Sequence, residues 1–196
     1  MADSPWKRYL WAAETMRDTY TIRPADPVHL ASIPGIEQAA ASTFPVRDLP
    51  LHLRYQVTDR DTLRLAQQDG RLWVALDGLR HPVGFALVEV ADDQAYLSEM
   101  DVHPDHGRRG LGTRLVHAVV EWAVSLGYER VLLVTFRHLP WNAPFYARLG
   151  FTQLEESELG PELRGFIEEE AAAGIDPANR IGMQMILRHQ RQPSLS

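Results

Sequence analysis

The apolar pattern changes its period between residues 94 and 126, and this change constrains the fold more than any other feature. The run QAYLSEMDV (94–102) is strand-like, and after Pro104 the apolar residues fall three or four apart, as on one face of a helix: Leu111, Leu115, Val119, Trp122 and Leu126. A turn rich in glycine and arginine joins the two: Gly107, Arg108, Arg109, Gly110 and Gly112. A strand that enters a long helix through such a turn predicts an α/β chain with an anion site at the helix N-terminus.

Further strands and helices are predicted on both sides of this unit. RLWVALD (71–77), HPVGFALVEV (81–90) and the run 94–102 are separated by short turns, which predicts an antiparallel meander. RVLLVTF (130–136) is almost wholly apolar, as in a strand buried on both faces. Other strands are expected at 19–25, from 150 onward and at 180–189. Helices are expected after Asp26, interrupted by Pro34 and Gly35, and after Asp59, at 142–149 and at 161–174.

The organisation of the chain follows from this order of elements. The sequence has neither an internal repeat nor a linker, so we expect one α/β domain over residues 19–190. An N-terminal arm would occupy 1–18 and a frayed tail 191–196. The absence of a signal-peptide core and of a membrane-length apolar run favours a cytoplasmic location without membrane association.

Charge and cysteine content exclude some functions. The net charge of -6 and pI of about 5.7 argue against nucleic acid as the main partner. They modestly favour a cationic substrate such as an amine. The chain has no cysteine, which excludes disulfides, thiolate metal sites and a cysteine nucleophile. No spacing of histidines and carboxylates resembles a metal site, so no metal is expected.

The glycine-rich turn fits a pyrophosphate better than other phosphate-binding patterns. Glycines let the backbone approach a phosphate closely, and Arg108 and Arg109 add charged donors. A Walker loop would need Gly-Lys followed by Ser or Thr, which is missing here. A dinucleotide fingerprint would need a glycine where Leu115 stands, which weakens the alternative of a Rossmann-like oxidoreductase. A purely structural turn with two surface arginines is the other interpretation.

The run VHPDHGRRGLGTRLV (102–116) resembles motif A of the GNAT N-acetyltransferase superfamily, Gln/Arg-x-x-Gly-x-Gly/Ala. Its Gly-x-Gly is Gly110-Leu111-Gly112, whereas Gly107 stands where the family usually has Gln or Arg. WNAPFYARLGF (141–151) resembles the second signature of the family, and the order of elements over 19–188 is similar as well. The resemblance implies a GNAT-like α/β (α+β) fold, with a mixed, mostly antiparallel sheet flanked by helices and with splayed central strands.

The resemblance also implies acetyl-CoA as cosubstrate and a set of residues that bind it. These are Met100, Asp101, Val102, Arg108, Arg109, Gly110, Leu111, Gly112, Thr113 and Asn142. The stretch from Met100 to Val102 would offer backbone hydrogen bonds to pantetheine in the gap between splayed strands. Asn142 has two interpretations of equal weight, a contact to the coenzyme or a cap on the helix that follows it.

Two residues are candidates for catalysis. Tyr146 takes the position of the family's tyrosine and would protonate the coenzyme A thiolate, whereas the alternative is a half-buried ring packed on Phe145 or Phe151. Glu99 would accept the proton of the amine, and its alternative is a solvated or salt-bridged strand residue. Strand alternation predicts that Leu97, Glu99 and Asp101 share one face. His138 is a weaker candidate for the base, and His103 and His106 could touch phosphate.

The acceptor is less defined than the donor. We expect a primary amine on a small molecule, acetylated by direct attack in a ternary complex, with Phe44 and the helix 161–174 walling its pocket. A protein N-terminus or lysine is a second candidate, and a coenzyme A-binding module without turnover is a third, from another class. Many relatives are dimers, so the resemblance also implies a homodimer. Trp6, Trp11 and Trp73 are expected in the core or at an interface.

Overall fold

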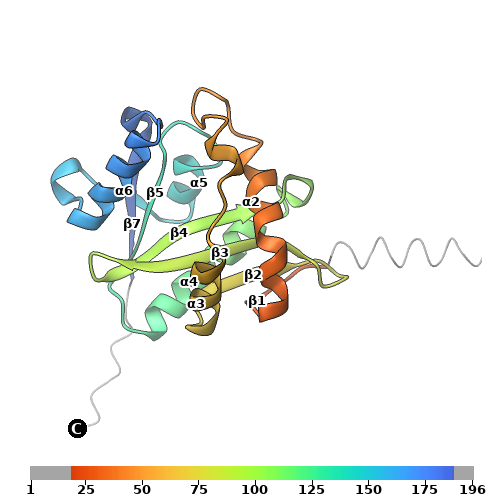
Figure 1. The fold of residues 1–196 in the computed structure, drawn as a ribbon. Coiled ribbons are helices and arrows are strands. Elements are labelled where there is room, and N and C mark those ends of the chain that lie inside the picture. The colour runs from red at the N-terminus through yellow and green to blue at the C-terminus, as the bar shows by residue number, and fades with distance from the viewer. Residues whose placement is uncertain (1–18, 188–196) are drawn as a thin grey trace, which may run out of the picture.

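A single seven-stranded sheet runs through the computed structural model, which describes residues 19–187 (Figure 1). The strands lie in the order β1-β2-β3-β4-β5-β7-β6, and every neighbouring pair is antiparallel except β4 and β5. Their bounds are β1 Thr21–Pro24, β2 Leu72–Leu76, β3 Pro82–Ala91, β4 Gln94–Val102, β5 Arg130–Phe136, β6 Thr152–Gln153 and β7 Arg180–Ile186. The predicted mixed, mostly antiparallel sheet is confirmed, although the strand expected from residue 150 is only two residues long.

Helices cover both faces of this sheet. They are α2 Ile33–Ala41, α3 Arg60–Gln68, α4 Leu111–Ser125, α5 Ala143–Arg148 and α6 Pro161–Ala172, with short 3-10 turns at Pro27–Ser32, Leu53–Tyr55, Pro104–His106, Glu156–Glu158 and Pro177–Asn179. Figure 1 shows α2 and α3 in front of the sheet and α4 behind it. Within residues 19–187, no helix combines the length and the apolar character needed to cross a membrane. The residues of the expected arm, with Trp6 and Trp11, and of the expected tail lie outside the described range.

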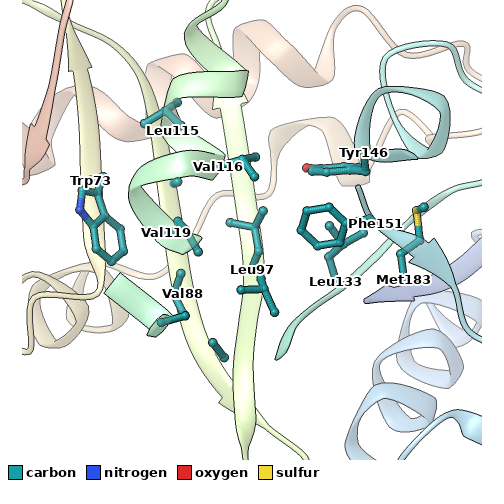
Figure 2. Close-up of a cluster of buried hydrophobic side chains, with 14 of the residues drawn as sticks. Trp73, Val88, Leu97, Leu115, Val116, Val119, Leu133, Tyr146, Phe151 and Met183 are labelled. Atoms are coloured by element: carbon teal, nitrogen blue, oxygen red, sulfur yellow. The ribbon is translucent and has the colours of Figure 1, made fainter. Parts of the chain in front are cut away.

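The main core lies between α4 and the sheet. Leu115, Val116 and Val119 are fully buried there, and Figure 2 shows them beside Val88 and Leu97 of the central strands. The period of three to four residues in the sequence therefore marks the buried stripe of α4, as predicted. Burial of this stripe fixes the N-terminus of α4 against the central strands. Trp73 of β2 belongs to the same core and meets Trp122 edge to face, with ring centroids 5.7 Å apart.

Local signals placed the helix ends well. Asp59 caps α3, since its carboxylate accepts hydrogen bonds from the backbone N–H of Asp61 at 2.9 Å and of Thr62 at 3.1 Å. Gly127 follows α4 with a φ of 82°, the left-handed conformation that ends a helix. The two-part helix after Asp26 is also confirmed, but its break lies between the 3-10 turn and α2. Pro34 stands in the first turn of α2 rather than interrupting the helix, because a missing N–H costs nothing there.

A bulge in β4 corrects the predicted alternation of its side chains. Leu87 of β3 pairs with Glu99, whereas the next residue of β3 pairs with Leu97, so that Ser98 is an extra residue. The expectation that Leu97 shares a face with Glu99 is therefore wrong. Leu97 packs in the core between α4 and the sheet. Glu99 and Asp101 lie on the opposite face of the sheet, because their partners on β3, Leu87 and Phe85, pack in the cluster that includes α2 and α3.

Candidate active site

The parallel strands β4 and β5 pair only at their beginnings and then separate. Ala95 pairs with Val131 and Tyr96 pairs with Leu132. Beyond these two pairs, β4 continues to pair with β3 and β5 continues to pair with β7. A cavity of about 1090 Å³ lies at this divergence. Its walls include both separating strands, the turn before α4, α5, part of α2 with the loop after it, and the end of α6. The predicted splay of the central strands is thus present, and the cavity lies where they separate.

The turn before α4 (residues 107–110) lines the cavity beside the first backbone N–H groups of that helix, which have no partner within the helix. Arg108 and Gly110 have positive φ values of 58° and 76°. Gly110 is the N-cap of α4, and the first turn of the helix holds no acidic side chain. A Cβ on Gly112 would come 3.3 Å from Cζ of Phe145, so a larger residue here requires that ring to shift. The turn has the shape and polarity of an anion site.

Most residues that the sequence predicted for coenzyme binding line this cavity. They are Met100, Asp101, Val102, Arg108, Gly110, Leu111, Gly112, Thr113 and Asn142. Arg109 is the exception, because its guanidinium lies 5.8 Å from the ring centroid of Tyr20, away from the cavity. His106 lines the cavity instead, and its Nδ1 is 3.0 Å from the Tyr20 hydroxyl. Burial, followed by the charge of His103, lowers the pKa of His106.

Asn142 does not cap the helix that it precedes. It occupies the N-cap position of α5, but its side chain accepts no capping hydrogen bond. Its Oδ1 is buried at the cavity and has no hydrogen-bond partner among the described residues. The capping interpretation is therefore wrong. A buried acceptor without a partner costs free energy unless a ligand satisfies it, which makes the amide available to a bound molecule.

Tyr146 projects from α5 into the cavity and is 7% exposed. Its ring meets Phe145 and Phe151 edge to face at centroid distances of 5.1 and 5.5 Å. Figure 2 shows the ring beside Phe151 and Leu133, with the hydroxyl end directed away from α5 toward β4. Burial raises the pKa of the Tyr146 phenol, and the charge of Glu99 raises it further, so the hydroxyl keeps its proton at neutral pH. The Tyr146 ring is therefore packed against its aromatic neighbours, while the side chain also lines the cavity.

Glu99 faces the cavity from β4 with a carboxyl group that is protonated more readily than usual. Burial raises the pKa of Glu99 to about 7, and the charge of Glu37 adds to this effect while that of Arg180 opposes it. Burial and the charge of Glu99 likewise raise the pKa of Asp101 well above its ordinary value. The pKa of Glu99 is therefore close to neutral pH, which is where a carboxylate is most effective as a general base.

Sequence analysis missed Glu37, which is 6% exposed and lines the same cavity from α2. Its carboxylate accepts hydrogen bonds from the backbone N–H of Thr58, at 3.1 and 3.2 Å, and from the Thr58 hydroxyl. Burial raises the pKa of Glu37, against the lowering effect of these bonds. A signal was present in the sequence, because Glu37 shares the buried stripe of its helix with Ile33, Ile36 and Ala40. A carboxylate on an apolar stripe is unusual unless it has a partner or a function.

Sequence analysis also missed an ion pair in the wall of the cavity. Arg180, the first residue of β7, donates from Nε and Nη2 to the two carboxylate oxygens of Glu170 at 2.6 and 2.5 Å. Its guanidinium carbon lies 4.3 Å from the ring centroid of Phe136. All three residues line the cavity. Nothing in the local sequence brings them together, since they come from β5, α6 and β7.

Two other sequence candidates do not reach the cavity. His138 pairs through Nε2 with Oδ1 of the buried Asp48 at 3.1 Å, and neither residue lines the cavity. His103 lies beside the turn and meets His106 ring to ring, at a centroid distance of 6.0 Å. His138 is thus poorly placed to act as a base. The cavity instead combines an anion site, a protonated phenol and a carboxylate of raised pKa, which are the groups needed to bind a phosphorylated thioester and to transfer its acyl group.

The chain belongs to the acetyltransferase (GNAT) family, whose model matches residues 33–151. This match spans α2 to Phe151 and includes the glycine-rich turn before α4 (residues 107–110), for which a phosphate-binding role is proposed below, together with Glu99, Asn142 and Tyr146. Among curated proteins, the chain is 30% identical over 69 residues to the uncharacterized N-acetyltransferase YobR of Bacillus subtilis. That match covers 35% of this chain and 28% of the relative, so the chain spans well under two thirds of the protein it resembles.

Solved structures share the fold. N-acetylglutamate synthase from Neisseria gonorrhoeae, complexed with coenzyme A and N-acetyl-glutamate, has a TM-score of 0.61 at 20% identity, over 87% of this chain and 36% of that chain. The ribosomal-protein-S18-alanine N-acetyltransferase of Escherichia coli has a TM-score of 0.59 at 19% identity, over 91% and 99%. The PaiA N-acetyltransferase of Thermoplasma acidophilum, in complex with coenzyme A, has a TM-score of 0.61 at 12% identity, over 86% and 99%. At these identities the likeness concerns the fold alone.

Proposed function

We propose that the protein transfers the acetyl group of acetyl-CoA to a primary amine of a small molecule, by direct attack in a ternary complex. The observation that carries this proposal is one cavity lined by the phosphate turn, by Tyr146 and by Glu99. Membership of the acetyltransferase (GNAT) family supports the same reaction class.

The residues present fit acetyl-CoA as the cosubstrate. The N–H groups at the start of α4, with Arg108, suit its pyrophosphate, and the small Gly112 lets the backbone approach it. The edge of β4 from Met100 to Val102 borders the gap to β5, where a strand-like amide chain such as pantetheine could be paired. The unsatisfied Oδ1 of Asn142 suits a donor on that chain.

Acetyl transfer then needs three proton movements. Glu99 in its ionised form takes a proton from the ammonium of the acceptor, and the free nitrogen attacks the thioester carbonyl carbon. As the tetrahedral intermediate collapses, the C–S bond breaks and Tyr146 gives its proton to the departing sulfur. The new amide nitrogen, positively charged after the attack, loses its second proton, which restores the phenol of Tyr146. The raised pKa of Tyr146 keeps the phenol proton available at neutral pH, whereas the pKa of about 7 for Glu99 leaves much of the carboxyl ionised.

A small acceptor is favoured over a peptide by the walls of the cavity. Phe44 and neighbouring residues of the loop after α2 line one side, and Glu170 near the end of α6 lines the other. The loop and the helix also touch, because His52 Nε2 lies 3.0 Å from the backbone oxygen of Ala173. A contact of this kind restricts the opening through which a polypeptide would have to enter.

The experiment is a titration of thiol release from acetyl-CoA by the full chain, with a panel of small amines and of peptides bearing free N-termini or lysines. Calorimetry measures the binding of acetyl-CoA to the same preparation. We expect binding and amine-dependent thiol release with a small amine. Release with peptides alone would support a protein acetyltransferase, and binding without release by any amine would leave a coenzyme-binding module.

A further inference from the structure

Resting on the proposed function, we infer that the acceptor is an amine without a carboxylate near its nitrogen. The residue that decides this is Glu170, because it binds the guanidinium of Arg180 in the wall of the cavity. Because Glu170 balances the charge of Arg180 and takes two of its N–H donors, Arg180 is a poor partner for the carboxylate of an amino acid.

Arg180 is held on two sides. Both of its contacts to Glu170 are charge-assisted hydrogen bonds in the bidentate geometry that guanidinium and carboxylate prefer. Its planar face lies on the Phe136 ring, with the guanidinium carbon 4.3 Å from the centroid. The Arg180 side chain is only 9% exposed, so little of it is accessible to a second anion. Separating a part-buried pair of this kind leaves two charges without their partners, which costs free energy.

This pair lies near the reacting groups. The charge of Arg180 acts on both Glu99 and Tyr146, and that of Glu170 acts on Glu99. Two other arginines line the cavity, but Arg108 belongs to the phosphate turn and Arg148 to the end of α5. Arg180 is therefore the arginine in position to meet a carboxylate attached close to the reacting nitrogen.

The other carboxyl groups of the cavity wall are those of Glu37, Glu99, Asp101 and Glu169. Burial raises the pKa of Glu37, Glu99 and Asp101, so these three groups are not all charged at neutral pH. An ammonium donates hydrogen bonds to carboxyl oxygens in either state and is attracted by those that are ionised, whereas an α-carboxylate would be repelled by the ionised ones. A neutral apolar body would instead contact the aromatic wall formed by Phe44, Phe136 and Trp141.

Matched acceptors test the inference directly. Tyramine and tyrosine, phenethylamine and phenylalanine, and tryptamine and tryptophan each differ only by the carboxylate next to their single amine. We expect kcat/KM for the better amines to exceed that of their amino-acid counterparts by about tenfold or more, the ratio that corresponds to about 1.4 kcal/mol. Equal values within every pair would overturn the inference and leave the proposed function intact. Acetylation of none of the six compounds or of the wider panel would overturn both.

The variant Glu170→Gln tests the role of the ion pair. It frees Arg180 while keeping a side chain of the same size, so the preference for the amine over the amino acid should fall several-fold. Glu168→Gln removes the same charge from an exposed position on the same helix and should leave the preference unchanged. A preference that is the same in Glu170→Gln, Glu168→Gln and the natural protein would contradict the assignment.

Arg180→Gln provides the second test and does not depend on how well Glu170→Gln folds. If Glu170 already occupies Arg180, this variant should leave the preference for amines as high as in the natural protein. If Arg180 instead binds an acceptor carboxylate, the variant should lose activity toward amino acids selectively, and the inference would be wrong. Circular dichroism of each variant verifies that the fold is intact before kinetics are compared.

Discussion

Glu99 on β4 and Tyr146 on α5 line one cavity, and the charge of Glu99 acts on the ionisation of Tyr146. Burial is the largest cause of the raised pKa of Tyr146, and the negative charge of Glu99 is the next. The carboxyl group itself titrates at a pKa of about 7, again mainly because of burial. A carboxylate that accepts a proton near neutral pH thus lies close to a phenol that keeps its own. These are complementary properties for a base and an acid in the same reaction.

Replacing Tyr146 by phenylalanine should lower kcat for acetyl transfer by about 100-fold or more, because the thiolate would leave without a proton donor. The KM for acetyl-CoA should change little, since the ring and its packing on Phe151 are kept. Thiol release under saturating acetyl-CoA measures the effect. The matched control is Tyr55→Phe, at a residue 75% exposed, which should retain full activity. Full activity of Tyr146→Phe would remove the phenol from the mechanism.

Activity should rise with pH through about 7, because Glu99 acts as a base only when it has lost its proton. Its raised pKa means that the carboxyl is protonated, and inactive as a base, over most of the range below 7. A profile of kcat/KM against pH from 5 to 9 measures this inflection, and Glu99→Gln should lower the rate and abolish the inflection. Glu129→Gln, at an exposed carboxylate, should keep the natural profile. An inflection that persists in Glu99→Gln belongs to another group.

Asn142→Ala should weaken the binding of acetyl-CoA without reducing the stability of the protein. Removal of a working helix cap costs about 0.5–2 kcal/mol, but the Asn142 side chain makes no capping bond, and its buried Oδ1 has no partner among the described residues. Calorimetry should therefore give a higher Kd, whereas thermal unfolding without ligand should give an unchanged or slightly higher Tm. A lower Tm with unchanged Kd would restore the capping interpretation.

Gly112→Ala should raise the KM for acetyl-CoA and leave kcat nearly unchanged once the site is saturated. The added methyl would lie 3.3 Å from Phe145 Cζ and 3.5 Å from Met100 Cε, so it would crowd the start of α4 where the pyrophosphate is expected. Gly165→Ala is the control, because that Cβ meets nothing within 4 Å and lies inside α6, where alanine should stabilise by about 0.5–1 kcal/mol. Equal KM values for the two variants would argue against a close approach of the ligand at Gly112.

Most elements of the fold could be predicted because their signals are local. The stripe of α4, the apolar run of β5 and the cap at Asp59 each depend on residues within a few positions of one another. The same holds for the phosphate turn, in which Gly110 takes the positive φ that ends the loop and begins the helix. The predicted meander and the separation of β4 from β5 also agree with the structure.

Within the site, the sequence alone was enough to propose residues for binding the donor, and those from the turn before α4 to Tyr146, other than Arg109, line one cavity. The face on which Glu99 lies was decided by the tertiary structure, because the extra residue Ser98 arises from the register between two strands and not from alternation within one. The tertiary structure also decided two pairings between separate elements. The charge of Glu37 on α2 acts on Glu99 on β4, and Glu170 on α6 accepts hydrogen bonds from Arg180 on β7. Pairings of this kind depend on how distant segments pack, and burial between those segments then sets the pKa of the carboxylates.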